Sequence, residues 1–256
     1  MKVTAAVVHE EAQPFSVEDL ELEEPRADEV LVRVVATGMC HTDVIVRDQW
    51  YPVPLPAVLG HEGAGVVERV GEGVSKVQPG DHVVLSFASC GECTNCLSGW
   101  PTYCLNFYDQ NFGGSRPDGS NALSKDGETV HGRFFGQSSF ANYSVAAERS
   151  VVKVREEAPL ELLGPLGCGV QTGAGGVLNT LRPEAGSSIG GSPRTMNRYA
   201  ALPRSSASDQ SCSEAGRTRS RAMSPLRMRS GMVRPTPNNC MGPMNAWVMK
   251  QNVTAW

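Results

Sequence analysis

The sequence predicts a mainly β fold, a compact β-barrel with helical connections, followed by a tail of a different kind. Short valine-rich runs separated by glycine- and proline-containing turns recur in residues 1–154, and this punctuation is typical of small barrels rather than helical domains. Helical patterning is concentrated in residues 159–181. Beyond residue 189 the composition changes abruptly, with few large apolar residues and many arginine, serine, proline and methionine residues.

The expected strands follow the valine-rich runs in chain order. Lys2–His9 opens a hairpin, and a turn at Pro25–Glu29 joins the second half of that hairpin to a strand at Val30–Ala36. Four more strands are expected at Ala64–Val70, His82–Phe87, Phe140–Val145 and Val151–Val154. The connection between residues 90 and 137 is long, polar and rich in glycine, and the four cysteines near its start favour a functional loop over a disordered one.

The chain after the last of these strands is predicted to be partly helical. Pro159–Leu181 has a helical pattern at both ends of a glycine-rich middle, Cys168–Gly176, and Ser187–Ile189 can begin a new strand. The predicted organisation is a barrel at 1–158, a linking segment at 159–189 and a tail at 190–256.

The net charge of −4 conceals an asymmetry between the two parts of the sequence. Residues 1–189 contain 13 basic and 25 acidic side chains, whereas residues 190–256 contain 10 and 2. The tail has three valines, two leucines and no isoleucine or phenylalanine, which is too little apolar area to offset the conformational entropy of an ordered chain. Disorder is therefore the prediction for the tail.

No secretory signal and no membrane-spanning run can be recognised in the sequence. The expectation is a cytoplasmic protein without a membrane partner. In that reducing compartment, cysteines serve as metal ligands more often than they form disulfides. This preference decides how the eight cysteines of the chain are interpreted.

Four closely spaced cysteines carry the clearest chemical signal. Cys90, Cys93, Cys96 and Cys104 follow a C-x2-C-x2-C-x7-C spacing, which can wrap one tetrahedral zinc ion and leave no open coordination position. Two disulfides are the alternative, less suited to a reducing compartment. A structural zinc ion would replace the apolar core that this polar loop lacks.

A second group of candidate ligands is spread over three motifs. His61 lies in G-H-E-x-x-G, Cys40 in C-H-T-D and Cys168 in G-C-G-V-x-T-G. Taken singly, each residue would be interpreted as an ordinary buried side chain. Taken together, one imidazole and two thiolates leave the fourth position of a zinc ion open for water or substrate.

These motifs resemble those of the zinc-dependent medium-chain alcohol dehydrogenases over roughly residues 1–189. The resemblance implies a GroES-like catalytic domain at 1–158 and the start of a dinucleotide-binding Rossmann domain at 159–189. The runs F-F-G-Q-S-S-F at 134–140 and G-C-G-V-Q-T-G-A-G at 167–175 are most similar to the aryl-alcohol (benzyl-alcohol) branch. The implied activity is oxidation of primary, in particular aromatic, alcohols with NAD as hydride acceptor.

The resemblance also assigns roles to single residues. It implies two zinc ions per chain, a structural one in the four-cysteine group and a catalytic one in the second group. Thr42 matches the hydroxyl that takes the proton of the alcohol, and Asp43 and Glu62 match carboxylates that orient the metal ligands. His41 matches a contact to the cofactor pyrophosphate, and Thr172 matches a nicotinamide contact. The expected small-molecule partner is an alcohol or its aldehyde.

The tail does not continue the resemblance. No G-x-G-x-x-G phosphate-binding turn follows Ile189, and Gly173–Gly176 is followed by Leu178 where the third glycine belongs. The dinucleotide-binding domain is therefore expected to be truncated or absent. Without that domain, the 256-residue chain is expected to lack NAD binding, catalytic activity and the homo-oligomer that the resemblance implies. The sequence does not distinguish NAD from NADP. A frameshift near Ile189 is the favoured explanation, with fusion or truncation as alternatives.

Two other functions are compatible with parts of the sequence. One is a zinc-stabilised fragment without catalysis. The other is a nucleic-acid binder, because the basic tail contains five clustered arginines: Arg217, Arg219, Arg221, Arg227 and Arg229. The tail lacks the interleaved aromatic and basic residues of such binders, which disfavours nucleic acid as a partner.

Overall fold

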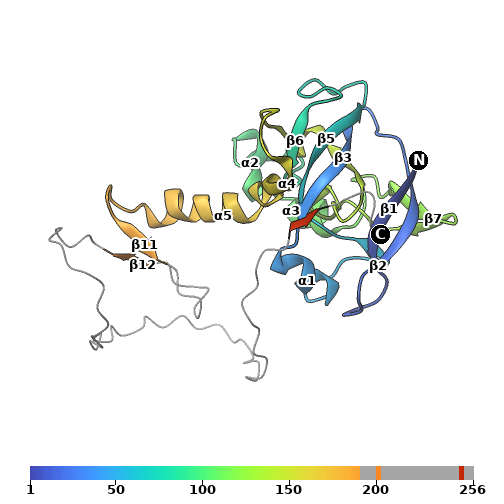
Figure 1. The fold of residues 1–256 in the computed structure, drawn as a ribbon, viewed down its shortest axis with the longest axis horizontal. Coiled ribbons are helices and arrows are strands. Elements are labelled where there is room, and N and C mark those ends of the chain that lie inside the picture. Colours follow the sequence, from blue (N-terminus) through green and yellow to red (C-terminus); the bar gives the residue numbers. More distant parts are fainter. Residues whose placement is uncertain (191–199, 203–247, 251–256) are drawn as a thin grey trace. The chain divides into compact units, whose positions relative to one another are not determined.

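The computed structural model describes residues 1–190, 200–202 and 248–250 (Figure 1). The chain divides into two compact units, Met1–Gly176 with Ala246–Trp256, and Val177–Asn245. The first unit contains two antiparallel sheets, so the prediction of a mainly β fold is confirmed.

One sheet of the first unit has five strands in the order β4–β1–β2–β7–β8. They are β1 (Lys2–Val8), β2 (Ser16–Leu22), β4 (Ala57–Val58), β7 (Leu123–Lys125) and β8 (Glu128–Val130). β1 and β2 form the expected opening hairpin, which closes with Val7 opposite Ser16. Val3, Ala5 and Val7 are buried along β1, because alternate residues of a strand face the same side of the sheet.

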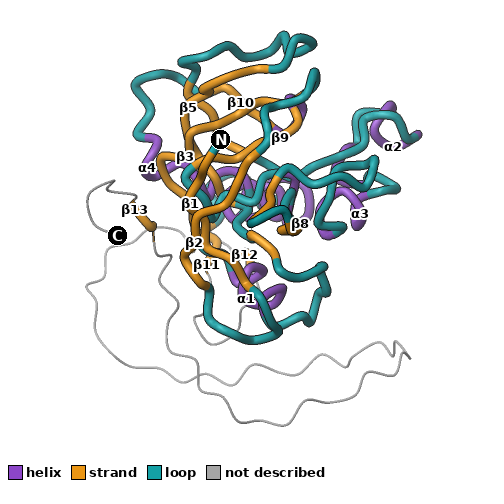
Figure 2. The backbone as a smooth tube through the Cα atoms, turned by 90° about the vertical axis from the view of Figure 1, so that its right-hand side faces the viewer, coloured by secondary structure: helices purple, strands orange, loops and turns teal. Residues whose placement is uncertain are grey.

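The other sheet runs in the order β10–β6–β5–β3–β13, and β9 also pairs with β3. Figure 2 labels β3, β5, β9 and β10 of this sheet. Its strands are β3 (Glu29–Gly38), β5 (Glu62–Val70), β6 (His82–Leu85), β9 (Tyr143–Ala147), β10 (Val151–Lys153) and β13 (Val248–Lys250). All residues of β3 except Arg33 are buried or half-buried, and β3 is an interior strand with β5 on one edge and β9 and β13 on the other.

The two sheets are joined beside the start of β9. Ala5 of β1 forms an isolated bridge with Ala141, and the neighbouring Ala6 N–H donates to the Phe140 carbonyl at 2.8 Å. The largest core cluster fills the space behind this junction and includes Val7, Val8, Leu31, Leu59 and Phe140. Each such side chain contributes roughly 1.5–3 kcal/mol when fully buried, so this cluster stabilises the closed arrangement.

Short helices occupy the connections. They are α1 (His41–Arg47), α2 (Thr94–Leu97), η1 (Pro101–Tyr103), α3 (Phe107–Phe112), η2 (Phe134–Gly136), η3 (Glu148–Ser150), α4 (Leu160–Leu163), η4 (Gly164–Gly167), α5 (Gly169–Gly175) and η5 (Gly176–Leu181). The loop at 90–137 is more regular than its composition indicates, since it contains α2, η1, α3 and the β7–β8 hairpin. Tertiary contacts order it: the buried Asn111 side chain bonds to both backbone groups of Ala88, and Phe107 meets Phe135 edge to face.

Several expected strands differ from the structure by one or two residues at an end, and two expectations differ more. The strand expected at Phe140–Val145 begins at Tyr143, because residues before it form the junction with β1 instead of a ladder. The glycine-rich middle at Cys168–Gly176 is helical and contains α5. Glycine costs about 1 kcal/mol relative to alanine inside a helix, which weakens the helical pattern of a sequence without forbidding a helix.

The second unit contains β11 (Ser188–Gly190), which pairs antiparallel with β12 (Ala200–Leu202). The strand expected to begin at Ser187–Ile189 is therefore present. Most of the tail, for which disorder is predicted, lies outside the described residues; the two tail segments described beyond residue 190 are the strands β12 and β13. The domain boundaries at 158 and 189 remain predictions. None of the helices in the described residues combines the length and the apolar character needed to cross a membrane.

Candidate metal sites

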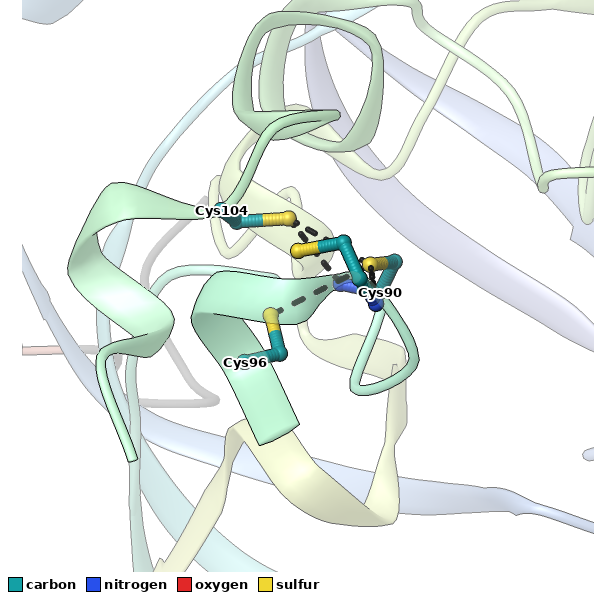
Figure 3. A group of neighbouring side chains, drawn as sticks. Cys90, Cys96 and Cys104 are labelled. Carbon is teal, nitrogen blue, oxygen red and sulfur yellow. Dashed lines mark hydrogen bonds between the residues drawn. The ribbon is translucent and has the colours of Figure 1, made fainter. Parts of the chain in front are cut away.

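The four closely spaced cysteines converge around α2 and η1 (Figure 3). Their sulfur atoms all lie within 4.8 Å of one another, and Cys90 Sγ is 3.9 Å from Cys96 Sγ and 3.5 Å from Cys104 Sγ. These separations are far above the ~2.05 Å of a disulfide bond, and all four cysteines are free thiols. Four sulfurs grouped in this way fit one tetrahedral zinc ion with no open position.

Backbone N–H groups favour the ionised form of part of this group. The Cys93 N–H lies 3.4 Å from Cys90 Sγ, and the Leu105 N–H lies 3.5 Å from Cys93 Sγ. Hydrogen bonds from the N–H groups of Leu105 and Cys96 lower the pKa of Cys93 to about 6, whereas burial raises the pKa of Cys96 to about 12. A bound cation would favour the thiolate form of all four cysteines.

The second group also converges. Ligand atoms of Cys40, His61, Glu62 and Cys168 all lie within 4.8 Å of one another. Cys168 Sγ is 4.0 Å from Cys40 Sγ and 3.3 Å from His61 Nε2. The two sulfurs and the imidazole nitrogen are a donor set suited to zinc, and a carboxylate oxygen of Glu62 lies beside them.

Three separate connections of the barrel supply these ligands. Cys40 precedes α1, His61 precedes β5, and Cys168 lies between η4 and α5. Gly60, directly before His61, has a φ of 91°, and a Cβ there would lie 2.5 Å from the Phe140 backbone nitrogen. Gly167, directly before Cys168, packs so closely on the Leu85 carbonyl that a Cβ would overlap it. Glycine at these two positions lets the ligand-bearing segments reach one place.

Asp43 joins two of the three segments. Its side chain is fully buried and accepts hydrogen bonds from the Cys40 N–H at 2.8 Å and the Gly60 N–H at 3.2 Å. Asp43 Oδ1 also lies 2.9 Å from His61 Nδ1. A proton on Nδ1 satisfies this contact and leaves Nε2, the nitrogen beside Cys168, free to bind a metal.

The titrating groups of this second group are strongly coupled. Burial opposes the charged form of His61, but hydrogen bonds with Asp43 and Cys40 prevail and raise its pKa to about 10. A hydrogen bond from Cys168 lowers the pKa of Cys40 to about 3, and the pKa of Cys168 is raised correspondingly. Burial, followed by the charge of Cys40, raises the pKa of Glu62. Zinc bound by this group would displace the protons that these side chains share.

The remaining candidate residues lie at different distances from the ligands. Thr42 Oγ1 is 3.7 Å from Cys40 Sγ, next to the ligand group. His41 is exposed at the start of α1, and Thr172 is exposed in α5, where its N–H donates to the Cys168 carbonyl at 3.0 Å. The structure brings Thr42, Asp43 and Glu62 to the site, while the cofactor contacts of His41 and Thr172 stay predictions.

Two residues of the site have no assignment from the sequence. The Phe135 ring stacks on His61 with centroids 4.6 Å apart and an interplanar angle of 26°. The buried Gln137 side chain bonds to the His61 carbonyl and the Gly63 N–H. The F-F-G-Q run contains both, but nothing in the spacing of residues 134–137 relates them to a histidine more than seventy positions away.

Comparisons with known proteins agree with this geometry. Residues 26–156 match the family described as the alcohol dehydrogenase GroES-like domain. A geraniol dehydrogenase from Castellaniella defragrans is 53% identical over 186 residues, which are 72% of this chain and 50% of that protein. The chain spans about half the length of the curated relatives it matches.

Two solved structures share the fold of the described barrel. An alcohol dehydrogenase zinc-binding domain protein from Burkholderia ambifaria has a TM-score of 0.71 and 60% identity, over 73% of this chain and 51% of that one. A benzyl alcohol dehydrogenase from Acinetobacter calcoaceticus has a TM-score of 0.70 and 53% identity, over the same 73% and 51%. The two donor sets fit two zinc ions, and the barrel is a GroES-like domain. This chain belongs to the zinc-dependent medium-chain alcohol dehydrogenase family.

Proposed function

We propose that this chain carries the metal-binding catalytic part of an NAD-dependent dehydrogenase of primary, in particular aromatic, alcohols. The observation that carries the proposal is the convergence of Cys40, His61 and Cys168 with the Glu62 carboxylate beside them. A Cys2His donor set leaves a coordination position for substrate, whereas the four-cysteine group has none and is structural.

Zinc in the second group would act as a Lewis acid that lowers the pKa of the substrate alcohol. The residues of the chain hold the ligands and move the proton. Asp43 fixes the ring of His61 and the backbone of Cys40, so two ligands keep their geometry. Thr42 is half-buried beside Cys40 and offers a hydroxyl that can accept the proton of the alcohol and pass it to water.

Phe135, which is half-buried and stacks on His61, is the aromatic side chain that supports an aromatic substrate, and the buried Phe134 and Phe112 back it from the core. Phe134 and Phe135 both contact the imidazole ring, and Phe112 packs edge to face on each of them. Ile45 of α1, five positions after Cys40, is half-buried and adds an apolar side chain to the same segment. Two similar proteins are named as dehydrogenases of geraniol and of benzyl alcohol, which makes alcohols of this kind the first substrates to test.

The partners of the whole protein follow from the same proposal. NAD would contact His41 and Thr172, both of which are exposed. His41 directly follows the ligand Cys40, and Thr172 lies in α5, the helix that begins directly after the ligand Cys168. The six cysteines of the described residues are free thiols available as metal ligands, which suits the cytoplasm. A homo-oligomer is proposed from the family resemblance alone.

Activity in a hybrid enzyme tests the proposal. Residues 1–189 are joined to the second half of the Acinetobacter benzyl alcohol dehydrogenase, and NADH formation with benzyl alcohol is measured. The hybrid is expected to be active, Cys168→Ser to abolish activity, and Thr42→Val to lower kcat by roughly 100-fold. A folded, zinc-loaded hybrid without activity, or one that is indifferent to Cys168→Ser, would contradict the proposal.

A further inference from the structure

Gln137 is a fully buried carboxamide at the centre of the ligand-bearing segments. Its side-chain Oε1 accepts from the Gly63 N–H at 3.0 Å, and its Nε2 donates to the carbonyls of His61 at 3.0 Å and Ser86 at 3.4 Å. Only 2% of the residue is exposed. One orientation of the amide satisfies all three partners, because its NH2 end meets two carbonyls and its oxygen meets one N–H.

This side chain fixes the backbone on both sides of Glu62. The hydrogen bonds to the His61 carbonyl and the Gly63 N–H hold the start of β5 in one position. Gly63 has no room for a side chain there, since a Cβ would lie 2.8 Å from Ser139 Cβ and 3.0 Å from Gln137 Oε1. The His61 imidazole and the Glu62 carboxylate therefore start from a backbone whose position Gln137 sets.

The third hydrogen bond extends to the segment that carries Cys168. Ser86 directly follows β6, and its Oγ lies 3.5 Å from the Gly167 carbonyl. Gln171, in the first turn of α5, donates from Nε2 to Ser86 Oγ at 3.4 Å. Gln137 is thus linked through one residue, Ser86, to both sides of the third ligand.

The segment around Gln137 has an unusual backbone that its surroundings enforce. Arg133, Phe135 and Ser138 have φ values of 57°, 49° and 52°, and Gly136 has 70°. Left-handed backbone is unfavourable for residues with a Cβ and persists where neighbouring contacts determine it, often at functional sites. Here the contacts are Ser138 Oγ to the Val58 carbonyl at 2.6 Å and the ion pair of Arg133 with a buried carboxylate.

We infer that Gln137 is a positioning residue for the Cys40–His61–Cys168 metal site, an inference that rests on the proposed function of that site. Its side chain bonds to the backbone and is not one of the four converging ligand side chains. It holds the backbone of His61 directly and that of Cys168 through Ser86, so that both ligands reach one ion. Loss of its hydrogen bonds should weaken metal binding at this site and leave the four-cysteine site unchanged.

Metal affinity of the purified 256-residue chain tests this without any alcohol or NAD. Cobalt(II) and zinc are titrated against a chelator, and the two sites are assigned with Cys93→Ser and Cys168→Ser. Gln137→Met, of similar shape, leaves three backbone groups without a partner. It is expected to lower affinity at the Cys40–His61–Cys168 site by about 10-fold or more and to alter the cobalt absorption of that site.

Asn111→Leu is the matched control. Asn111 is also fully buried and also makes three backbone hydrogen bonds, accepting from the Ala88 N–H and donating to the carbonyls of Ala88 and Phe107, but none of these groups belongs to a ligand-bearing segment of the Cys40–His61–Cys168 site. Its loss should leave the cobalt spectrum of that site unchanged. If Gln137→Met does not fold, Gln137→Glu replaces it, because a carboxyl group keeps the shape and has at most one donor for the two carbonyls.

Each outcome decides the inference. A selective loss of affinity at the Cys40–His61–Cys168 site supports it. Unchanged affinity in a folded variant, or equal losses at both sites, would overturn it and reduce Gln137 to a residue that only stabilises the fold. A wild-type chain that binds no metal at Cys40, His61 and Cys168 would overturn both the proposed function and this inference. If the hybrid binds metal but has no activity, and Gln137→Met still loses metal affinity only at this site, the proposed function fails and this inference stands.

Discussion

Glu29 shows how single buried charges shape this barrel. Its carboxylate is 2% exposed and accepts from Arg116 Nε at 2.9 Å, Arg116 Nη2 at 3.0 Å and Arg133 Nη1 at 2.5 Å. Burial opposes the ionised form of Glu29. Hydrogen bonds from the Arg116 side chain and the Arg26 N–H, with the charges of Arg116 and Arg133, outweigh burial, so the pKa of Glu29 lies below the usual 4.5. Because Arg133 is the first of the positive-φ residues around Gln137, its ion pair with Glu29 also anchors the segment that carries Gln137.

The pH dependence of stability should report this carboxylate. A group whose folded pKa is depressed contributes stability above its unfolded pKa of about 4.5 and loses it as pH falls through the folded value. Glu29→Gln is therefore expected to lower the free energy of unfolding by about 3 kcal/mol at pH 7 and by much less well below pH 4, measured by urea unfolding. Glu24→Gln, whose carboxylate pairs with Arg69 at the surface, is the control and should cost at most about 1 kcal/mol. Equal losses in both variants would refute the argument.

Zinc content tests the two donor sets residue by residue. The purified chain should contain close to two zinc ions, one for each group of converging side chains. Cys93→Ser should remove the ion of the four-cysteine group, and Cys168→Ser should remove the other, because a zinc site that loses one of its thiolates binds far more weakly. Mass spectrometry under native conditions counts the ions directly. A folded wild-type chain with one ion or none would contradict the two-site interpretation.

At the scale of elements, the strands that the sequence predicts are those with a regular pattern of apolar residues. The valine-rich runs of β1, β3, β5 and β6 are strands because alternate or continuous apolar residues face the core. The short helices between residues 94 and 112 have no such pattern. They are held by distant partners, as when Asn111 bonds to the backbone of Ala88, and a local pattern does not encode such contacts.

The turn formed by η4 is the element on which the position of Cys168 most depends. A Cβ on Gly167 would overlap the Leu85 carbonyl, so Gly167→Ala must push η4 and Cys168 away from β6. This variant is expected to weaken zinc at the Cys40–His61–Cys168 site by roughly 10-fold or more while the four-cysteine site stays filled, as measured by chelator competition.

Gly173→Ala in α5 is the matched control for that variant. No atom lies within 4 Å of a Cβ built on Gly173, and alanine favours a helix by about 1 kcal/mol over glycine. It should bind zinc as the wild type does and unfold at the same or a higher denaturant concentration. If the two alanine variants lost zinc equally, close packing of η4 on β6 could not be the cause.

At the scale of the whole molecule, the sequence predicts which metal ligands belong together but not the contacts that hold those ligands in position. The motifs around Cys40, His61 and Cys168 are local and recognisable, so the donor set is predictable from spacing and resemblance. The contacts of Phe135 and Gln137 with His61 exist only after β5, β6 and η2 have packed, and no pattern within one segment records them. Residues 191–199, 203–247 and 251–256 lie outside the described part, so the predictions for the tail stay predictions.

Substrate preference is the property that the whole barrel should determine. Phe134 and Phe135 contact the ring of His61, and the same F-F-G-Q run supports the resemblance to aryl-alcohol dehydrogenases. In the hybrid of residues 1–189 with a family cofactor-binding half, kcat/KM for benzyl alcohol should exceed that for ethanol by roughly 10-fold or more, because the ring adds apolar contact that ethanol cannot make.

Phe135→Ala should reduce this ratio more than Val17→Ala, a change at an exposed position of β2. The unjoined chain with NAD is the blank and is expected to be inactive. A kcat/KM for ethanol equal to or above that for benzyl alcohol would show that the aromatic cluster around His61 does not select the substrate.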